Sequence, residues 1–214
     1  MVSPLLLALL LAVPPEASSR ILRLPPVDQC ASDPSFADFR DALLAAIERR
    51  DRDALLALVA EDIEVDFGGG AGRDYFAAAW ELDRPDTSRL WDELGRALRL
   101  GCARDPEGEY YSSPSMFLTG EAAFADPFTG AVAIRPGAEL RSAPNAASDV
   151  VGALDWDVMT VPDWDHEASW QRVELADGRG GYVRSEDLRS PIDYRIVFQR
   201  VGGSWRITTF IAGD

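Results

Sequence analysis

The fold is decided by one stretch, residues 170–183, whose sequence is WQRVELADGRGGYV. It holds two short runs that contain aromatic and β-branched residues. Between them lies Asp177-Gly178, a dipeptide typical of tight turns between strands. The stretch therefore predicts two strands, over residues 169–175 and 180–184, joined by that turn.

The same pattern extends outward on both sides of this stretch. Short strands are expected over residues 139–142, 149–155 and 157–162, separated by closely spaced turn residues. Such spacing is typical of a small β-barrel, which we place at residues 131–191. After it, residues 192–214 predict a β-hairpin.

The region before the barrel, residues 34–130, has a helical pattern. Asp33 can cap a helix, and Pro34 suits its first position. Further helices are expected over residues 74–82 and 88–100, and alternating residues predict a strand over 62–67. The first helix has its apolar residues at helical spacing: Phe36, Phe39, Leu43 and Ile47. The fold class is therefore α+β.

The N-terminus has the pattern of a secretory signal peptide, residues 1–19. The apolar run Leu5–Val13 is too short to span a bilayer, and small residues follow it at Ala17-Ser18-Ser19. We therefore expect a periplasmic or secreted protein without stable membrane insertion. Residues 20–33 have no periodicity and are expected to be a linker.

The charge of the chain restricts its partners. The formal net charge is −15 at pH 7, which argues against binding nucleic acid, whose phosphates require a basic surface. A cationic or neutral partner is expected instead.

The chain has two cysteines, Cys30 and Cys102. In an oxidising compartment they could pair and tie the segment before the first helix to the end of the helical region. The alternative is two separate buried thiols.

Residues 138–188 resemble the bacterial SH3-like domain. The matching residues are Leu140-Arg141-Ser142-Ala143-Pro144, Val150-Val151-Gly152-Ala153-Leu154, Val158, Val161, Trp170, Val173, Leu175, Asp177-Gly178-Arg179-Gly180-Gly181-Tyr182-Val183 and Leu188. The resemblance implies a small barrel. It also implies peptide binding, including cell-wall peptides, along an aromatic groove, although such domains also occur as spacers.

The flanking segments bear a weaker resemblance to the nuclear-transport-factor-2-like α+β fold. It rests on two N-terminal helices followed by a strand, and on a closing hairpin with Trp205-Arg206-Ile207 after a Gly-Gly turn. It implies that the barrel is inserted into a discontinuous outer domain. The alternative is an N-terminal helical domain with the hairpin packed beside the barrel.

The best candidate for a binding site is an acidic, tryptophan-rich loop of the predicted barrel. Exposed indole rings attract cations, and surrounding carboxylates add long-range attraction. The candidate ligand-binding residues are Trp156, Asp157, Asp163, Trp164, Asp165, Glu167 and Tyr182. The alternative is that the tryptophans fill the core while the acids are solvated.

Three functions follow from these observations. The first is a non-enzymatic binding module for a peptide, cell-wall or protein ligand, with no cofactor and no metal. The chain has one histidine, His166, so a two-histidine zinc site is excluded. The second is a small-molecule or catalytic pocket in the outer domain, with Asp66 and Trp80 as candidate residues. The third is a purely structural barrel.

Overall fold

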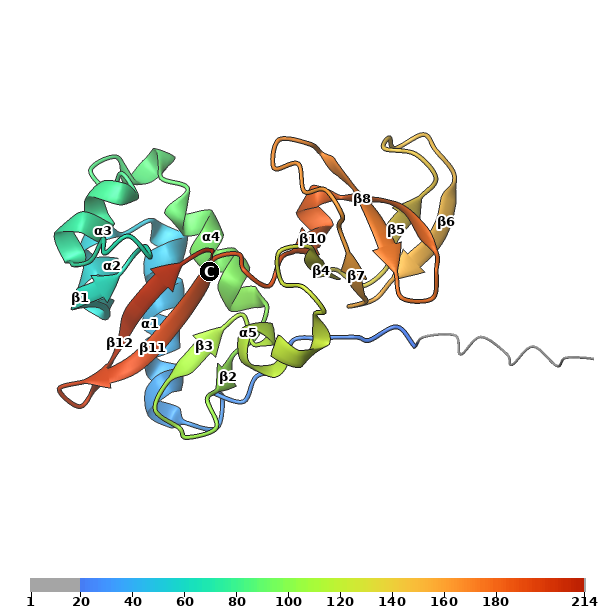
Figure 1. Ribbon diagram of the computed structural model, residues 1–214. Helices are drawn as coiled ribbons and strands as arrows, with labels where there is room; N and C mark the ends of the chain where they lie inside the picture. The colour runs from blue at the N-terminus through green and yellow to red at the C-terminus, as the bar shows by residue number, and fades with distance from the viewer. Residues whose placement is uncertain (1–19, 214) are drawn as a thin grey trace, which may run out of the picture.

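The computed structural model describes residues 20–213, so the predicted signal peptide lies outside the described residues. The chain is of the α+β class and forms two units (Figure 1). The first unit combines the helices with a five-stranded sheet, and the second is built on a seven-stranded sheet.

The helices confirm most of the expected pattern. They are α1 (Pro34–Arg49), α2 (Arg52–Leu58), α3 (Arg73–Ala79), α4 (Leu90–Arg99) and α5 (Met116–Thr119), with 3-10 turns η1 (Pro85–Thr87), η2 (Glu121–Ala123) and η3 (Ser185–Asp187). Asp33 caps α1 as expected, because its carboxylate accepts hydrogen bonds from the amides of Ser35 and Phe36.

The strands fall into three groups along the chain. Those before the second unit are β1 (Val59–Glu64), β2 (Ala103–Arg104) and β3 (Tyr111–Ser113). The second unit contains β4 (Gly130–Ala133), β5 (Ala138–Arg141), β6 (Val150–Leu154), β7 (Val158–Thr160), β8 (Trp170–Leu175), β9 (Gly180–Arg184) and β10 (Leu188–Arg189). The closing hairpin is β11 (Arg195–Val201) and β12 (Ser204–Ile211).

The closing hairpin belongs to the first unit. The sheet order is β1-β12-β11-β3-β2, in which β12 is parallel to β1 and β11 is antiparallel to β3. The chain thus leaves the first unit after α5, forms the second unit and returns. The alternative that places the hairpin beside the second unit is wrong, because its strands complete the first sheet.

Aromatic side chains fill the core of the first unit. Phe36 is fully buried and packs edge-on against the rings of Tyr111 and Phe198, with centroid distances of 4.9 and 5.1 Å. A second cluster joins Trp80 to Tyr194 and Phe210. Such pairs stabilise beyond the burial of their area.

The second unit forms one antiparallel sheet of order β10-β4-β7-β8-β9-β5-β6. The Asp177-Gly178 turn joins β8 and β9 as expected, with Gly178 at φ 85°. In the described strands β6 and β10 remain the two edges, so this pairing does not close into the expected barrel. The buried core is aliphatic, formed by side chains such as Leu140 and Val173.

Residues 20–33 were expected to be a linker, but they form backbone hydrogen bonds with both units. The Leu22 carbonyl accepts from the Val158 amide, and the Leu24 amide donates to the Trp156 carbonyl. Further along, the Val27 carbonyl accepts from the Cys102 amide of the first unit. We call residues 22–29 the strap. The backbone N–H and C=O groups of the strap form hydrogen bonds with these neighbours. The sequence did not indicate these bonds, because the segment has no periodicity.

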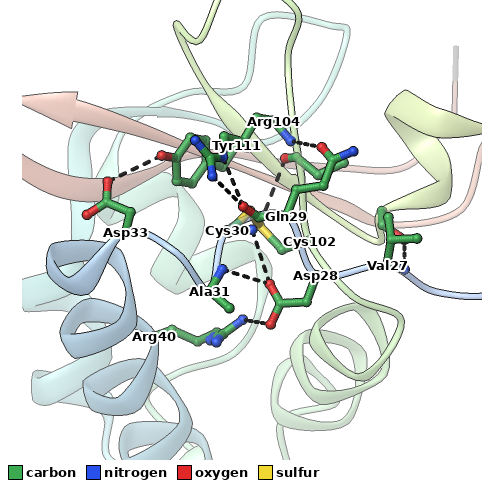
Figure 2. The surroundings of a disulfide bond; sticks show 12 residues. Val27, Asp28, Gln29, Cys30, Ala31, Asp33, Arg40, Cys102, Arg104 and Tyr111 are labelled. Atoms are coloured by element: carbon green, nitrogen blue, oxygen red, sulfur yellow. Dashed lines mark hydrogen bonds and ion pairs between the residues drawn. A yellow bond between two sulfur atoms is a disulfide. The ribbon is translucent and has the colours of Figure 1, made fainter.

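A disulfide bond between Cys30 and Cys102 fixes the C-terminal end of the strap (Figure 2). Both residues are buried, and Arg104 covers the bond by donating to the Gln29 carbonyl. Asp28 accepts from the Cys30 amide and pairs with Arg40 of α1 at 2.6 Å. The strap is therefore held to α1 and β2 on both sides of the bond.

The strand expected over residues 62–67 begins and ends earlier. It is β1, Val59–Glu64, and Phe67 beyond it is 59% exposed. The Asp66 carboxylate accepts from the Gly70 amide at 2.8 Å and turns the chain away from the sheet. A local side-chain hydrogen bond thus ended the strand despite the continued alternation.

Candidate functional site: the cleft between the two units

The structure does not bring Trp156, Trp164 and Tyr182 into one furrow. Each of the three rings is partly buried, and each lines a different hollow. The expected acidic and aromatic loop is therefore not a single binding surface.

Trp156 faces the junction of the two units. It lines a crevice together with Leu24 of the strap, Leu100 and Met116, where the free volume is about 10 Å³. That space is no larger than one water molecule needs. Trp156 is held at φ 62°, a conformation that bulky residues rarely adopt. Its role is to pack the junction.

Among the four predicted acids, Asp157 lies apart from the other three. Asp157 is 3% exposed, and its carboxylate accepts from the Arg23 Nε at 3.0 Å and from the Asp155 amide at 2.8 Å. It fixes the strap to the second unit. Asp163, Asp165 and Glu167 are exposed, and Asp165 accepts from the Glu167 amide within the loop.

Tyr182 lies on β9 beside a hollow of about 320 Å³ whose charged groups are paired. Arg172 contacts Glu174 at 2.6 Å, and Arg179 contacts Asp177 at 2.8 Å. The hydrogen bonds from Arg179 also lower the pKa of Asp177.

The two residues of the alternative pocket serve structural contacts. Asp66 accepts from the Tyr75 hydroxyl at 2.7 Å and from the Gly70 amide, and these bonds hold its pKa below the usual value. Trp80 packs against Tyr194 at 5.0 Å and Phe210 at 5.3 Å between ring centroids. Aromatic side chains thus occupy the place where that pocket was expected.

A larger hollow lies between the two units, and we call it the cleft. Its volume is about 610 Å³, and both units and their connection contribute to it. The lining residues are Arg89, Glu93, Arg96, Phe128, Trp164, His166, Gln171, Ser185, Leu188, Ser190, Ile192, Asp193, Tyr194, Ala212 and Gly213. Its size and its mixture of apolar and polar groups suit a small ligand or a peptide end.

The side of the cleft formed by the second unit carries two stacked rings. The planes of Trp164 and His166 are 7° from parallel, with centroids 6.2 Å apart. The Trp164 ring packs against the aliphatic core, whereas His166 is exposed. The buried Trp164 Nε1–H has no acceptor among residues 20–213. Gln171 fixes the loop by donating to the Asp165 carbonyl at 2.6 Å.

The opposite side is formed by α4 and the residue before it. Arg89, Glu93 and Arg96 are spaced at i, i+4 and i+7, which places them on one face of the helix. Arg96 lies 3.9 Å from Glu93, whose side chain is 12% exposed. Arg89 is exposed, and its guanidinium has no ion-pair or hydrogen-bond partner within the described part of the chain.

A buried arginine lies where the second unit connects back to the first. Arg189 is 1% exposed, donates to the Tyr194 carbonyl, and lies 3.3 Å from the Asp193 carboxylate. Burial lowers the pKa of Arg189, and the Asp193 charge opposes this effect. Burial, aided by the Glu93 charge, raises the pKa of Tyr194, so its phenol stays neutral at pH 7.

Within residues 20–213, no three side chains of histidine, cysteine, aspartate or glutamate gather as a metal site would require. No helix in the same range has the length and apolar character needed to cross a membrane. The sequence matches no protein-family model and no curated protein.

Sequence reasoning found Trp164 of this cleft but missed its opposite side. The signal was present in the spacing of Arg89, Glu93 and Arg96 along the expected helix. That spacing is ambiguous in a sequence, because charges so arranged are also typical of an ordinary solvated helix face.

Proposed function

We propose that the protein is an exported, non-enzymatic binding protein whose peptide ligand occupies the cleft. In this proposal residues 131–191 are a bacterial SH3-like module, inserted into an outer domain of the nuclear-transport-factor-2-like type. The observation that carries it is the stacked pair of Trp164 and His166 on one side of a 610 Å³ cleft.

The state of Trp164 supports a binding role over a purely structural one. A buried N–H without an acceptor costs about 1–3 kcal/mol. Core aromatics usually avoid that cost, as Trp205 does by donating to the Ser35 hydroxyl at 3.1 Å. Trp164 lies beside the cleft with this N–H unsatisfied among residues 20–213, which favours a recognition role for its loop.

The surroundings of His166 favour binding over catalysis. A general base needs an orienting hydrogen bond and a nucleophile or substrate proton within reach. Among residues 20–213 the imidazole makes no hydrogen bond, and its neighbour is the Trp164 ring. It supplies a flat surface on which a ligand group can stack.

Export is supported by the Cys30–Cys102 disulfide together with the signal-like residues 1–19. Disulfides persist in the periplasm and outside the cell and are rare in the cytosol. A peptide of the envelope or the extracellular medium would be accessible there.

The test is equilibrium binding of two fluorescent probes, dansyl-leucine and dansyl-leucinamide, to the full chain. Each carries an aromatic group and an apolar side chain; the first ends in a carboxylate and the second in an amide. We expect saturable binding of at least one probe, weakened about tenfold or more by Trp164→Ala, since stacking contributes about 1–3 kcal/mol. The His166→Ala variant should also bind less, and it changes an exposed residue, so the fold is kept.

Trp170→Ala is the matched control. Trp170 lies on β8 of the same unit, outside the cleft lining, where its ring contacts Arg184. Its replacement should leave probe binding unchanged. Binding that is insensitive to both Trp164→Ala and His166→Ala would contradict the proposed site.

A further inference from the structure

We infer that the cleft recognises an anionic group, and that its ligand is a peptide presenting a free C-terminal carboxylate. The inference rests on the proposed function and assigns the chemistry of the ligand. It differs from the cationic or neutral partner expected from the net charge of −15.

Two arginines, Arg89 and Arg96, and two acids, Glu93 and Asp193, line the cleft, and their ion pairs leave one arginine over. Glu93 lies beside Arg96, and Asp193 lies beside the buried Arg189, so each acid already has an arginine partner. Arg89 remains, with its guanidinium exposed and without an ion pair among residues 20–213. Arg89 is therefore left without an ion pair in the described part of the chain, because Asp193 pairs with Arg189, which is not part of the lining.

The guanidinium of Arg89 lies where it could bind the carboxylate of a ligand. Arg89 and the stacked rings of Trp164 and His166 line the same cleft from the two units. A guanidinium binds a carboxylate with two parallel N–H···O bonds, whereas a terminal amide offers one neutral acceptor. An apolar side chain next to that carboxylate would lie against Trp164, Leu188 and Ile192.

The negative net charge of the protein disfavours the approach of anions, so the positive charge of Arg89 acts on them only locally. A net charge of −15 repels an anion at long range. Exposed Asp163 and Glu167 lie on the loop that carries Trp164 but not in the cleft lining. Within the cleft, an anion is therefore favoured where it reaches Arg89.

The experiment compares dansyl-leucine with dansyl-leucinamide, which differ only in the terminal charge. The first should bind roughly tenfold more tightly, because hydrogen bonds to charged groups exceed neutral ones by that order. Arg89→Gln should remove this preference, because it should weaken the binding of dansyl-leucine far more than that of dansyl-leucinamide. Arg99→Gln, on the same helix but outside the cleft lining, should keep the preference.

The outcomes separate the inference from the function on which it rests. Equal binding of both probes that still depends on Trp164 would overturn the carboxylate preference and retain the cleft as the binding site. A preference that persists in Arg89→Gln would also overturn the inference, since the anion would then bind elsewhere. Absence of binding by either probe would overturn both proposals.

Discussion

In the first unit Phe36 packs edge-on against the rings of Tyr111 and Phe198, whereas the buried core of the second unit is aliphatic. The described aromatic residues of the second unit lie at its periphery, where Trp156 faces the junction and Trp164 the cleft. The first unit thus uses its rings for internal stability. The second unit makes its rings available for contacts with other groups.

The two units also differ in the covalent and non-covalent contacts that stabilise them. The first contains the disulfide and the complete set of helices α1–α5. The second is a seven-stranded sheet with an aliphatic core, connected to the first unit by the strap beside β7 and by the buried Arg189 of β10. We therefore expect the first unit to unfold as the more stable body and the second to respond more to changes at the junction.

The largest expected effect is loss of the disulfide. A Cys30→Ala/Cys102→Ala variant opens a crosslink that spans 72 residues of the chain, and by loop entropy this should lower the free energy of unfolding of the first unit by about 4 kcal/mol. Urea unfolding followed by circular dichroism measures it. A loss below about 1 kcal/mol would contradict the assigned role of the bond.

A substitution in the aliphatic core tests the stability of the second unit separately from that of the first. Leu140→Ala should lower the stability of the second unit by about 3 kcal/mol, since Leu140 is fully buried. Amide hydrogen exchange should increase across β5, β8 and β9 and stay unchanged in α1. Val151→Ala is the control, because Val151 is 50% exposed. Equal acceleration in both units would show that they unfold as one.

The strap offers a test of the junction alone. Asp157→Ala removes the buried acceptor of Arg23 and of the Asp155 amide, at an expected cost of about 2 kcal/mol. Faster hydrogen exchange at the Leu24 and Val158 amides would report release of the strap. Asp163→Ala, at an exposed acid, should leave both amides protected, and protection that survives Asp157→Ala would contradict the role of Asp157.

The smallest effect is expected at the start of α1. Asp33→Ala removes the helix cap and should cost about 1 kcal/mol near neutral pH. The Ser35 hydroxyl bond, with the Phe36 and Ser35 amides, lowers the pKa of Asp33 in the folded state. Its charged form therefore stabilises the protein above the unfolded pKa of about 4, and this contribution is lost as the pH falls through the lower folded value.

Unfolding in urea at neutral pH and at about pH 3 measures this dependence. The stability difference between the wild type and Asp33→Ala should be smaller at the acidic pH. A difference that grows on acidification would contradict the cap.

The sequence predicted elements whose signals are local. The cap at Asp33 and the turn at Asp177-Gly178 depend on a few neighbouring residues, and both are confirmed. The strand beyond Glu64 was wrong because the Asp66–Gly70 bond overrides alternation. The short strands β4 and β10 were missed, since β4 pairs with β10 and with β7, which lie far along the chain.

The candidate site was predicted in part for a similar reason. A tryptophan-rich loop can be recognised from composition, but which way each ring faces depends on the other unit. Trp156 turned to the junction and Trp164 to the cleft because the strap and α4 lie on different sides of the second unit. The contribution of Arg89 required the arrangement of both units.

The most direct test of the cleft as the binding site uses His166, the one histidine in the chain. Its imidazole Cε1–H gives one proton resonance, which we would follow during titration with dansyl-leucine at a pH well above the usual histidine pKa of about 6.5. We predict a saturable shift with the same affinity as the fluorescence titration. A resonance that stays fixed while fluorescence reports saturation would place the ligand elsewhere and contradict the account.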